Sequence, residues 1–282
     1  NGDPKRIEAY NLLKELKTKG ISRQEIIKII TNKFNFSRGI VYDWHSDRSI
    51  PWKLKEKIEY LEHGKELFYI LGAMLGDGCI YYWKKSRDCQ VKIYGEKEFI
   101  EKCATKLSIC LKKKINGYYY KSYYKRFGGD LWFINISHKK LFILFKNIRN
   151  NLNSIFDLIA KGNYKENCLF FIEGFFDAEG CVKIIKEKVR KTPKICLDIT
   201  NTNFRLLELI RRSLEDKLKI EARYSNQKAF LGKDGSWRQK IYHLRIYKKE
   251  YIRRFLNNIS TIKLKPEKVA YVENWLNNGL GS

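Results

Sequence analysis

Two acidic residues occupy matching places in two similar stretches of the sequence. Asp77 ends LGAMLGD at residues 71–77, and Glu179 ends IEGFFDAE at residues 172–179; each is followed by Gly-Cys and a strand-like run. A single Asp-Gly after an apolar helix is usually only a turn, but the recurrence of the whole arrangement favours a shared role. Carboxylates are hard oxygen ligands for Mg²⁺, and such metal sites hydrolyse phosphodiesters. The pair therefore predicts that chemistry.

The helices that precede these acids must bring them together. Gly72 and Gly76 are four residues apart, as are Gly174 and Ala178. Small residues at this spacing share one helix face, where a second backbone can approach closely. We predict that the two helices pack along these strips and place the two carboxylates side by side. Two negative charges at the negative ends of helix dipoles repel each other unless a cation lies between them.

The sequence after about residue 64 passes twice through the order helix, strand, strand, helix, strand, strand, helix. The first pass is predicted at 67–77, 79–83, 89–94, 96–111, on both sides of 128–130, and at 138–151. The second is predicted at 168–178, 181–186, 195–201, 203–218, on both sides of 232–235, and at 249–258, with a last helix at 266–277. Polar and apolar residues alternate in strands such as 90–94, which predicts antiparallel sheets with one face covered by helices.

The predicted fold class is therefore α+β, with two pseudo-symmetric αββαββα halves. Their curved, antiparallel four-stranded sheets would form a saddle for DNA, and a small all-α domain precedes them. We assign residues 1–62 to this helical module, 63–164 to the first half and 165–282 to the second.

The helical module at 1–62 has the pattern of a helix-turn-helix. Ser22 to Glu25 matches a capping box, and Ser37 can start a third helix. Small three-helix units also dock proteins, so both interpretations stay open. The candidate DNA contacts are Arg38, Tyr42, His45 and Arg48.

The composition indicates a polyanionic partner. The chain has 57 Lys and Arg against 31 Asp and Glu, a formal net charge of +26, with 14% aromatic residues. This combination favours nucleic acid over an anionic membrane surface or a merely lysine-rich proteome. Lysines alternate with aromatic residues in NGYYYKSYYKRF at 116–127. The candidate nucleic-acid contacts in the sheets are Lys84, Gln90, Lys92, Tyr119, Lys121, Tyr123, Lys125, Lys183, Arg223, Arg238 and Lys240.

The cysteines and histidines argue against a zinc site. Seven cysteines include no CxxC pair, and four histidines lack ligand-like spacing. Scattered cysteines in apolar segments predict reduced thiols in an intracellular protein of the cytoplasm, nucleoid or an organelle. No signal peptide opens the chain and no apolar run reaches about 18 residues, so no membrane span is expected.

At the two acidic stretches the sequence resembles the LAGLIDADG homing endonucleases. ILGAMLGDG at 70–78 and IEGFFDAEG at 172–180 stand where the two motifs of that family would be, although Leu75 occupies the inner acidic position of the first. The resemblance implies that Asp77 and Glu179 are the metal-binding catalytic acids. It also implies metal coordination by the backbone carbonyls of Gly76 and Ala178, and a catalytic role for Lys265.

The resemblance further implies a monomeric, single-chain enzyme that cuts a long asymmetric site in double-stranded DNA and leaves short 3′ overhangs. The cofactor would be Mg²⁺, with Mn²⁺ as a substitute and Ca²⁺ as an ion that binds without supporting cleavage. The helical module would lengthen the footprint by tethering. Alternatives are a DNA-binding regulator derived from such an enzyme and an RNA-splicing maturase, since sheets and cations can serve both nucleic acids. Intact acids favour the endonuclease.

Overall fold

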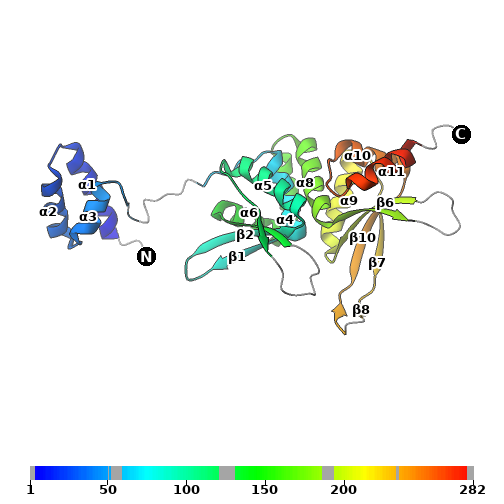
Figure 1. The fold of residues 1–282 in the computed structure, drawn as a ribbon, viewed down its shortest axis with the longest axis horizontal. Helices are drawn as coiled ribbons and strands as arrows, with labels where there is room; N and C mark the ends of the chain where they lie inside the picture. Colours follow the sequence, from blue (N-terminus) through cyan, green and yellow to red (C-terminus); the bar gives the residue numbers. More distant parts are fainter. Residues whose placement is uncertain are drawn as a thin grey trace. The chain divides into compact units, whose positions relative to one another are not determined.

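Residues 59–282 form one structural unit of the protein, and residues 1–58 form another (Figure 1). The computed structural model describes residues 4–49, 51, 59–120, 131–185, 194–232 and 235–277. No described helix is long and apolar enough to cross a membrane.

Three helices make the smaller unit: α1 (Pro4–Thr18), α2 (Arg23–Phe34) and α3 (Arg38–His45). They close on a core of their own in which Leu13, Ile30 and Trp44 are almost fully buried. The N-cap half of the predicted capping box is formed: Ser22 Oγ accepts a hydrogen bond from the Glu25 N–H at 3.4 Å and donates one to the Glu25 carboxylate at 2.8 Å. The capped helix start fixes where α2 leaves the preceding turn.

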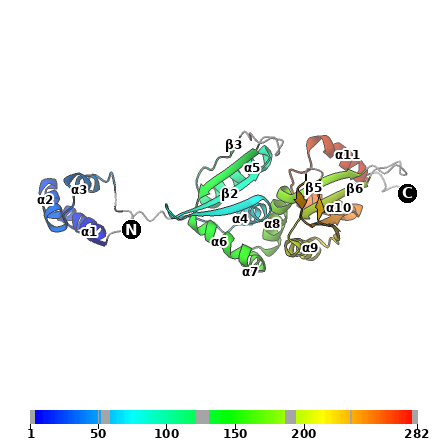
Figure 2. The ribbon, with the colours of Figure 1, turned by 90° about the horizontal axis from the view of Figure 1, so that it is seen from below.

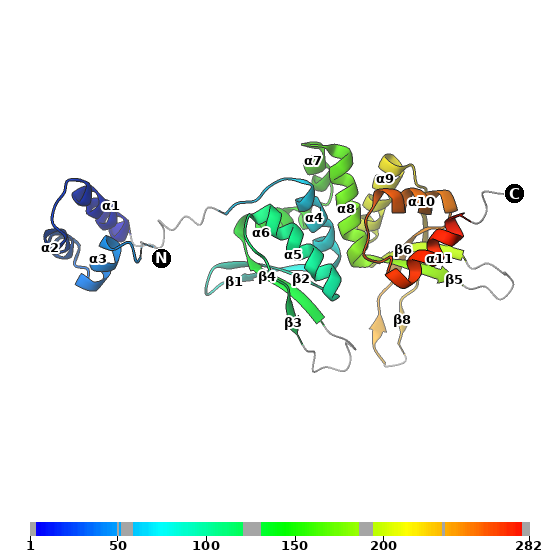
Figure 3. The same cartoon turned by 45° about the horizontal axis from the view of Figure 1, so that its top comes forward.

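The larger unit is centred on two helices that pack side by side, α4 (Lys65–Asp77) and α8 (Tyr164–Glu179) (Figure 3). Their small residues make close approach possible. A Cβ on Gly72 would collide with the backbone of Phe171 and Phe175, and one on Gly174 with the backbone of Tyr69. The glycines are therefore required by the helix contact itself.

Each central helix leads into a four-stranded antiparallel sheet. The first sheet has the order β1 (Gly78–Trp83), β2 (Asp88–Gly95), β4 (Leu131–Ser137), β3 (Tyr118–Tyr120). The second has the order β5 (Gly180–Ile185), β6 (Lys194–Asn201), β10 (Ile241–Ile246), β7 (Arg223–Gln227). The registers also correspond, because Gly78 pairs with Ile93 as Gly180 pairs with Ile199. The α+β prediction with two similar halves is thereby confirmed.

Helices cover one face of each sheet, as Figures 1 and 2 show. The covering helices beyond the central pair are α5 (Lys97–Leu111), α6 (Lys139–Asn150), α9 (Phe204–Leu218), α10 (Lys249–Asn258) and α11 (Pro266–Asn277). Alternate strand residues such as Val91, Ile93, Leu197 and Ile199 point into the core beneath them. The other face of each sheet is open, and both open faces lie on the same side of this unit.

Two features extend the predicted pattern. Helix α7 (Ser154–Ala160) lies between the two halves of the sequence, and a short hairpin of β8 (Phe230–Leu231) and β9 (Trp237–Arg238) extends β7 and β10. The predicted turn at 128–130 lies outside the described residues.

Candidate active site

The two acids end the two central helices and lie against each other's helix. A Cβ on Gly76 would meet Ala178 Cβ and Glu179 Cγ, so the Glu179 side chain crosses the end of α4. Directly after the acids, Gly78 and Gly180 begin the first strand of each sheet. The carboxylates therefore lie where the contact between α4 and α8 meets the first strand of each sheet.

The surroundings hold both carboxylates partly in the protonated state near neutral pH. Burial raises the pKa of Asp77 to about 6, and burial together with the negative charge of Asp77 raises the pKa of Glu179 to about 7. Asp77 nevertheless reaches solvent and Glu179 is half-buried, so the site is open. The positive charge of Lys263 acts on both acids and opposes these shifts.

The two carboxylates fit a hard divalent cation that also takes ligands other than side chains, such as backbone carbonyls. Among the described residues no cluster of three His, Cys, Asp or Glu could hold a metal by itself. Carbonyls in the last turn of a helix lack intrahelical partners, and Gly76 and Ala178 lie in such turns. Two mutually repelling carboxylates with raised pKa values are the arrangement that a cation would stabilise.

Asn201 is a direct partner of Glu179. Its Nδ2 donates to Glu179 Oε1 at 2.8 Å, and its Oδ1 accepts the Asn203 N–H at 2.8 Å. By strand register the equivalent residue in the first half is Gly95, which has no side chain to offer Asp77. The two acids therefore have unequal support.

Asp177, the inner acid of the second motif, is fully buried and makes four hydrogen bonds. It accepts hydrogen bonds from two groups of the first half, Tyr69 Oη at 2.9 Å and Lys102 Nζ at 2.7 Å. It also accepts Thr261 Oγ1 at 2.6 Å and the Ile262 N–H at 3.1 Å. Asp177 thus anchors the segment that carries Lys263.

Lys263 is the lysine of this segment whose positive charge acts on both acids. Lys265 Nζ lies 3.0 Å from Glu96 Oε2, and this hydrogen bond holds the pKa of Glu96 below its usual range. Lys263 is not among the candidates predicted from the sequence, although it is only two residues from Lys265, whose catalytic role stays a prediction. The difference depends on how Asp177 holds residues 261–262, which no local pattern reveals.

The candidate residues of the smaller unit gather on α3 and just after it. The guanidinium groups of Arg23 and Arg48 lie 5.1 and 5.6 Å from the Tyr42 ring centre. Burial lowers the pKa of His45, which favours the neutral form of its ring. A hollow of about 590 Å³ between α2 and α3 includes Arg38 and Tyr42. The surface combines cations with an aromatic ring.

The candidate contacts of the first sheet divide between its two faces. Gln90 and Lys92 alternate with the buried residues of β2 and lie on the open face, while Lys84 is exposed in the turn after β1. Tyr119 pairs with Trp132, and both lie on the helix-covered side, so Tyr119 does not point from the open face as expected. Lys121, Tyr123 and Lys125 lie outside the described residues.

The open face of the second sheet carries an ionic cluster around Asp198. This fully buried carboxylate pairs with Lys183, with His243 Nδ1 at 3.2 Å and with Arg245 Nε at 3.3 Å. Only Lys183 was expected from the sequence. Of the other candidates, Arg223 lies on the exposed edge strand β7, Arg238 on the hairpin, and Lys240 Nζ is 4.8 Å from the Tyr242 ring centre.

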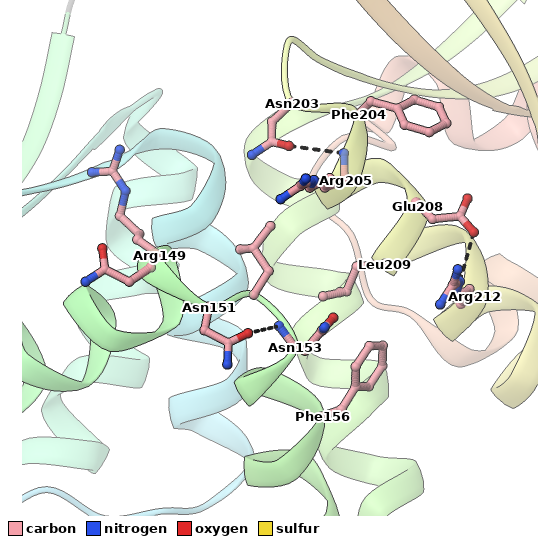
Figure 4. Close-up of a pocket in the computed structure, with 12 residues that line it drawn as sticks. Arg149, Asn151, Asn153, Phe156, Asn203, Phe204, Arg205, Glu208, Leu209 and Arg212 are labelled. Carbon is pink, nitrogen blue, oxygen red and sulfur yellow. Dashed lines mark hydrogen bonds and ion pairs between the residues drawn. The ribbon is translucent and has the colours of Figure 1, made fainter.

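A cavity of about 480 Å³ lies where the ends of α6 and α7 face α9 (Figure 4). Asn203 caps α9 by accepting the Arg205 N–H at 3.1 Å, and Arg212 pairs with Glu208 at 2.8 Å. Through Asn203 and Asn201 the cavity is joined to Glu179 by hydrogen bonds. Of the candidate residues predicted from the sequence that the structure describes, none lines this cavity.

Comparisons with known proteins agree with the resemblance. Residues 166–260 match the family model of the LAGLIDADG-like domain. An uncharacterized protein of Methanocaldococcus jannaschii is 28% identical over 273 residues, which cover 93% of this chain and 92% of that protein. A second uncharacterized protein of that organism is 30% identical over 176 residues, 62% of each chain.

Solved structures of similar fold include endonucleases and a further class of protein. The homing endonuclease I-DmoI in complex with DNA and Ca is 23% identical, with a TM-score of 0.47, and the match covers 74% of this chain and 97% of that one. The N-terminal LAGLIDADG domain of DUF199/WhiA is 16% identical, also with a TM-score of 0.47, over 77% and 90%. At these identities the likeness says nothing about chemistry. The family model nevertheless matches residues 166–260, the part of the chain that holds the second motif, which agrees with the resemblance.

Proposed function

We propose that this protein is a divalent-cation-dependent endonuclease that makes a double-strand break in a long asymmetric DNA site and leaves short 3′ overhangs. The observation that carries the proposal is the pair Asp77 and Glu179, brought together by α4 and α8 with raised pKa values. The pair lies between two open sheet faces in a chain of net charge +26. The protein acts as a monomer, because one chain contributes both acids.

Asp77 and Glu179, with the backbone carbonyls of Gly76 and Ala178, would hold Mg²⁺ or Mn²⁺. The ion, when bound, activates a water and neutralises charge on the phosphate. Asn201 keeps the Glu179 carboxylate oriented through its 2.8 Å hydrogen bond. Lys263 stabilises the negative charge that develops on the phosphate. We assign this role to Lys263 in place of Lys265.

Binding to the duplex would use the open sheet faces, with Gln90 and Lys92 on one side and Lys183 and Arg223 on the other. Long-range attraction follows from the net charge, and affinity should fall with a log-log salt slope of about 0.9 for each neutralised phosphate. The smaller unit would add contacts through Arg38, Tyr42 and Arg48, with His45 beside them.

The test is cleavage of a plasmid library with randomised inserts in Mg²⁺, read by sequencing the cut ends. Asp77→Asn and Glu179→Gln should each abolish double-strand cleavage while the affinity for a selected duplex stays within about threefold, because phosphate contacts dominate affinity. The matched control is Asp216→Asn at a position of α9 far along the chain from both motifs, where the carboxylate pairs with its neighbour Lys217 and with Tyr164. Full cleavage by either active-site variant would contradict the two-acid assignment.

A second candidate function is a DNA-binding regulator that no longer cuts. The observation that favours it is the bare surroundings of Asp77, where Gly95 replaces the partner that Asn201 gives to Glu179. Tight binding of a selected duplex without any nicking in Mg²⁺ or Mn²⁺ would support this alternative.

A further inference from the structure

The open faces of the two four-stranded sheets have opposite chemical character. In the first sheet, strand register places aromatic rings from all four strands on the open face: Tyr81, Trp83, Tyr94, Tyr118 and Phe133. We call this set the aromatic face. Their sequence neighbours, such as Ile80, Ile93 and Ile134, point into the core instead. Strand alternation therefore forces these rings toward solvent.

Three rings of the aromatic face are exposed, Tyr94 and Phe133 are partly buried, and the rings form two groups of neighbours. Tyr81, Trp83 and Tyr118 are 51%, 47% and 52% exposed. The Tyr81 and Trp83 rings lie 4.7 Å apart at 65°, and the Phe133 ring lies 5.7 Å from Tyr118 and 6.1 Å from Tyr94. Exposed apolar area of this extent usually marks a binding surface.

The open face of the second sheet carries more basic residues than that of the first. On the described strands of the first sheet, Lys92 is the one basic residue of the open face. The second open face has Lys183, Arg223, His243 and Arg245, and its described strands place no Phe, Tyr or Trp there. Basic side chains and a carboxylate can bind phosphates and the edges of bases. A duplex exposes both of these groups along its grooves.

Aromatic rings suit a different ligand. In a duplex the faces of the bases are covered by their neighbours in the stack, and only their edges are exposed. Ring faces become available in unpaired strands, where bases stack on Tyr, Trp and Phe side chains. We infer that the aromatic face binds unpaired nucleobases of a single strand, an activity separate from the cleavage of duplex DNA.

The experiment uses two adjacent tyrosines of β1 that differ in the face they occupy. Tyr81 belongs to the aromatic face, whereas Tyr82 is 48% exposed on the opposite side, with its ring 6.4 Å from that of Phe142. Tyr81→Ala and Tyr82→Ala in the full chain thus remove the same ring at similar exposure. Binding is measured by fluorescence anisotropy of labelled dT12, U12 and a 12-base-pair duplex in EDTA, so that cleavage cannot contribute.

We expect Tyr81→Ala to weaken binding of the single strands by roughly 5- to 150-fold, the range of one base-aromatic stack. Duplex binding should fall clearly less than single-strand binding, because Gln90 and Lys92 of the same face remain available to the duplex, and Tyr82→Ala should leave all three affinities near wild type. Trp83→Ala should repeat the Tyr81→Ala result, and thermal melting confirms that each variant is folded. A preference for U12 identifies RNA as the source of the unpaired bases, and a preference for dT12 identifies DNA.

Equal losses in Tyr81→Ala and Tyr82→Ala would overturn the inference, as would a loss confined to the duplex or the absence of single-strand binding by the wild type. Because no metal is present and the acids are untouched, these outcomes are independent of whether the protein cuts DNA.

Discussion

The two halves of the larger unit have the same strand order and register, yet they support their acids differently. The second half has Asp177 at the inner motif position and Asn201 at the end of its second strand. The first half has Leu75 and Gly95 in the corresponding places. The backbone of the fold therefore does not depend on these polar residues, which serve the site.

The residue at the inner motif position determines whether that half holds a further segment near the acids. Asp177 accepts hydrogen bonds from Thr261 and Ile262 and so holds Lys263 near both carboxylates. Leu75 is partly buried and packs against the apolar core, so it can hold no such segment. After α6 the chain forms α7 instead. The charge of one lysine then acts on both acids, so the symmetry of the fold does not extend to the surroundings of the pair.

The largest expected effect separates the two lysines of the 261–265 segment. Lys263→Met should slow cleavage by about 100-fold or more, the usual loss when one group that stabilises developing charge is removed. Lys265→Met should cost less than about threefold, because this residue faces Glu96. Single-turnover cleavage in saturating Mg²⁺ measures both. The reverse ranking would return the catalytic role to Lys265.

A smaller effect should appear when the second half is made to resemble the first. The wild type should cut its two strands at different rates, because only Glu179 has an amide partner. Asn201→Gly removes that partner and should slow the faster strand by about 10-fold, since an outer-shell partner of a metal ligand typically contributes about 10- to 100-fold. Duplexes labelled on each strand report the nicked intermediate. Equal strand rates in the wild type would show that the structural asymmetry has no kinetic consequence.

The smallest effect concerns stability and pH. The folded state raises the pKa of Asp77 to about 6 and of Glu179 to about 7. Between about pH 4 and 7 the folded protein therefore binds more protons than the unfolded chain, and its free energy of unfolding falls as pH rises. Without metal, Glu179→Gln should melt a few degrees higher than wild type at pH 8 and differ little at pH 4, since 1 kcal/mol shifts Tm by about 2–4 °C.

Divalent cations should restore the wild-type melting temperature at pH 8 more than at pH 5, because the ion competes with protons for the same carboxylates. Differential scanning fluorimetry with Mg²⁺, Mn²⁺ and Ca²⁺ checks this. A melting temperature of Glu179→Gln that rises with Mg²⁺ as much as that of the wild type would indicate that the ion binds elsewhere.

The two acid motifs and the order of elements follow from local patterns. Apolar spacing locates α4 and α8, glycines four residues apart mark their contact face, and alternation identifies β2. Each of these signals lies within one helix or strand, where periodicity reflects which side is buried. Helix α7 was not foreseen, because its seven residues are too short for a periodic signal.

The face of the sheet to which a tyrosine points was harder to predict. A shift of one residue moves every side chain to the other face, so Tyr118 and Tyr119 exchange roles with the register of β3 against β4. The acid Asp198 and its partners Arg245 and His243 come from strands more than 40 residues apart. Neither the register of β3 against β4 nor the contacts of Asp198 can be recognised from the amino-acid composition.

By itself, the sequence determined that two carboxylates would end two helices packed at small residues, because helix periodicity and the absence of side chains at glycine are local properties. Only the tertiary structure decided what surrounds those carboxylates. Thr261 meets Asp177 across 84 residues, and Asn201 meets Glu179 through strand pairing. Such contacts arise when separate elements dock, and the hydrogen bonds of a buried acid such as Asp177 are satisfied by whichever donors the docked elements bring within reach.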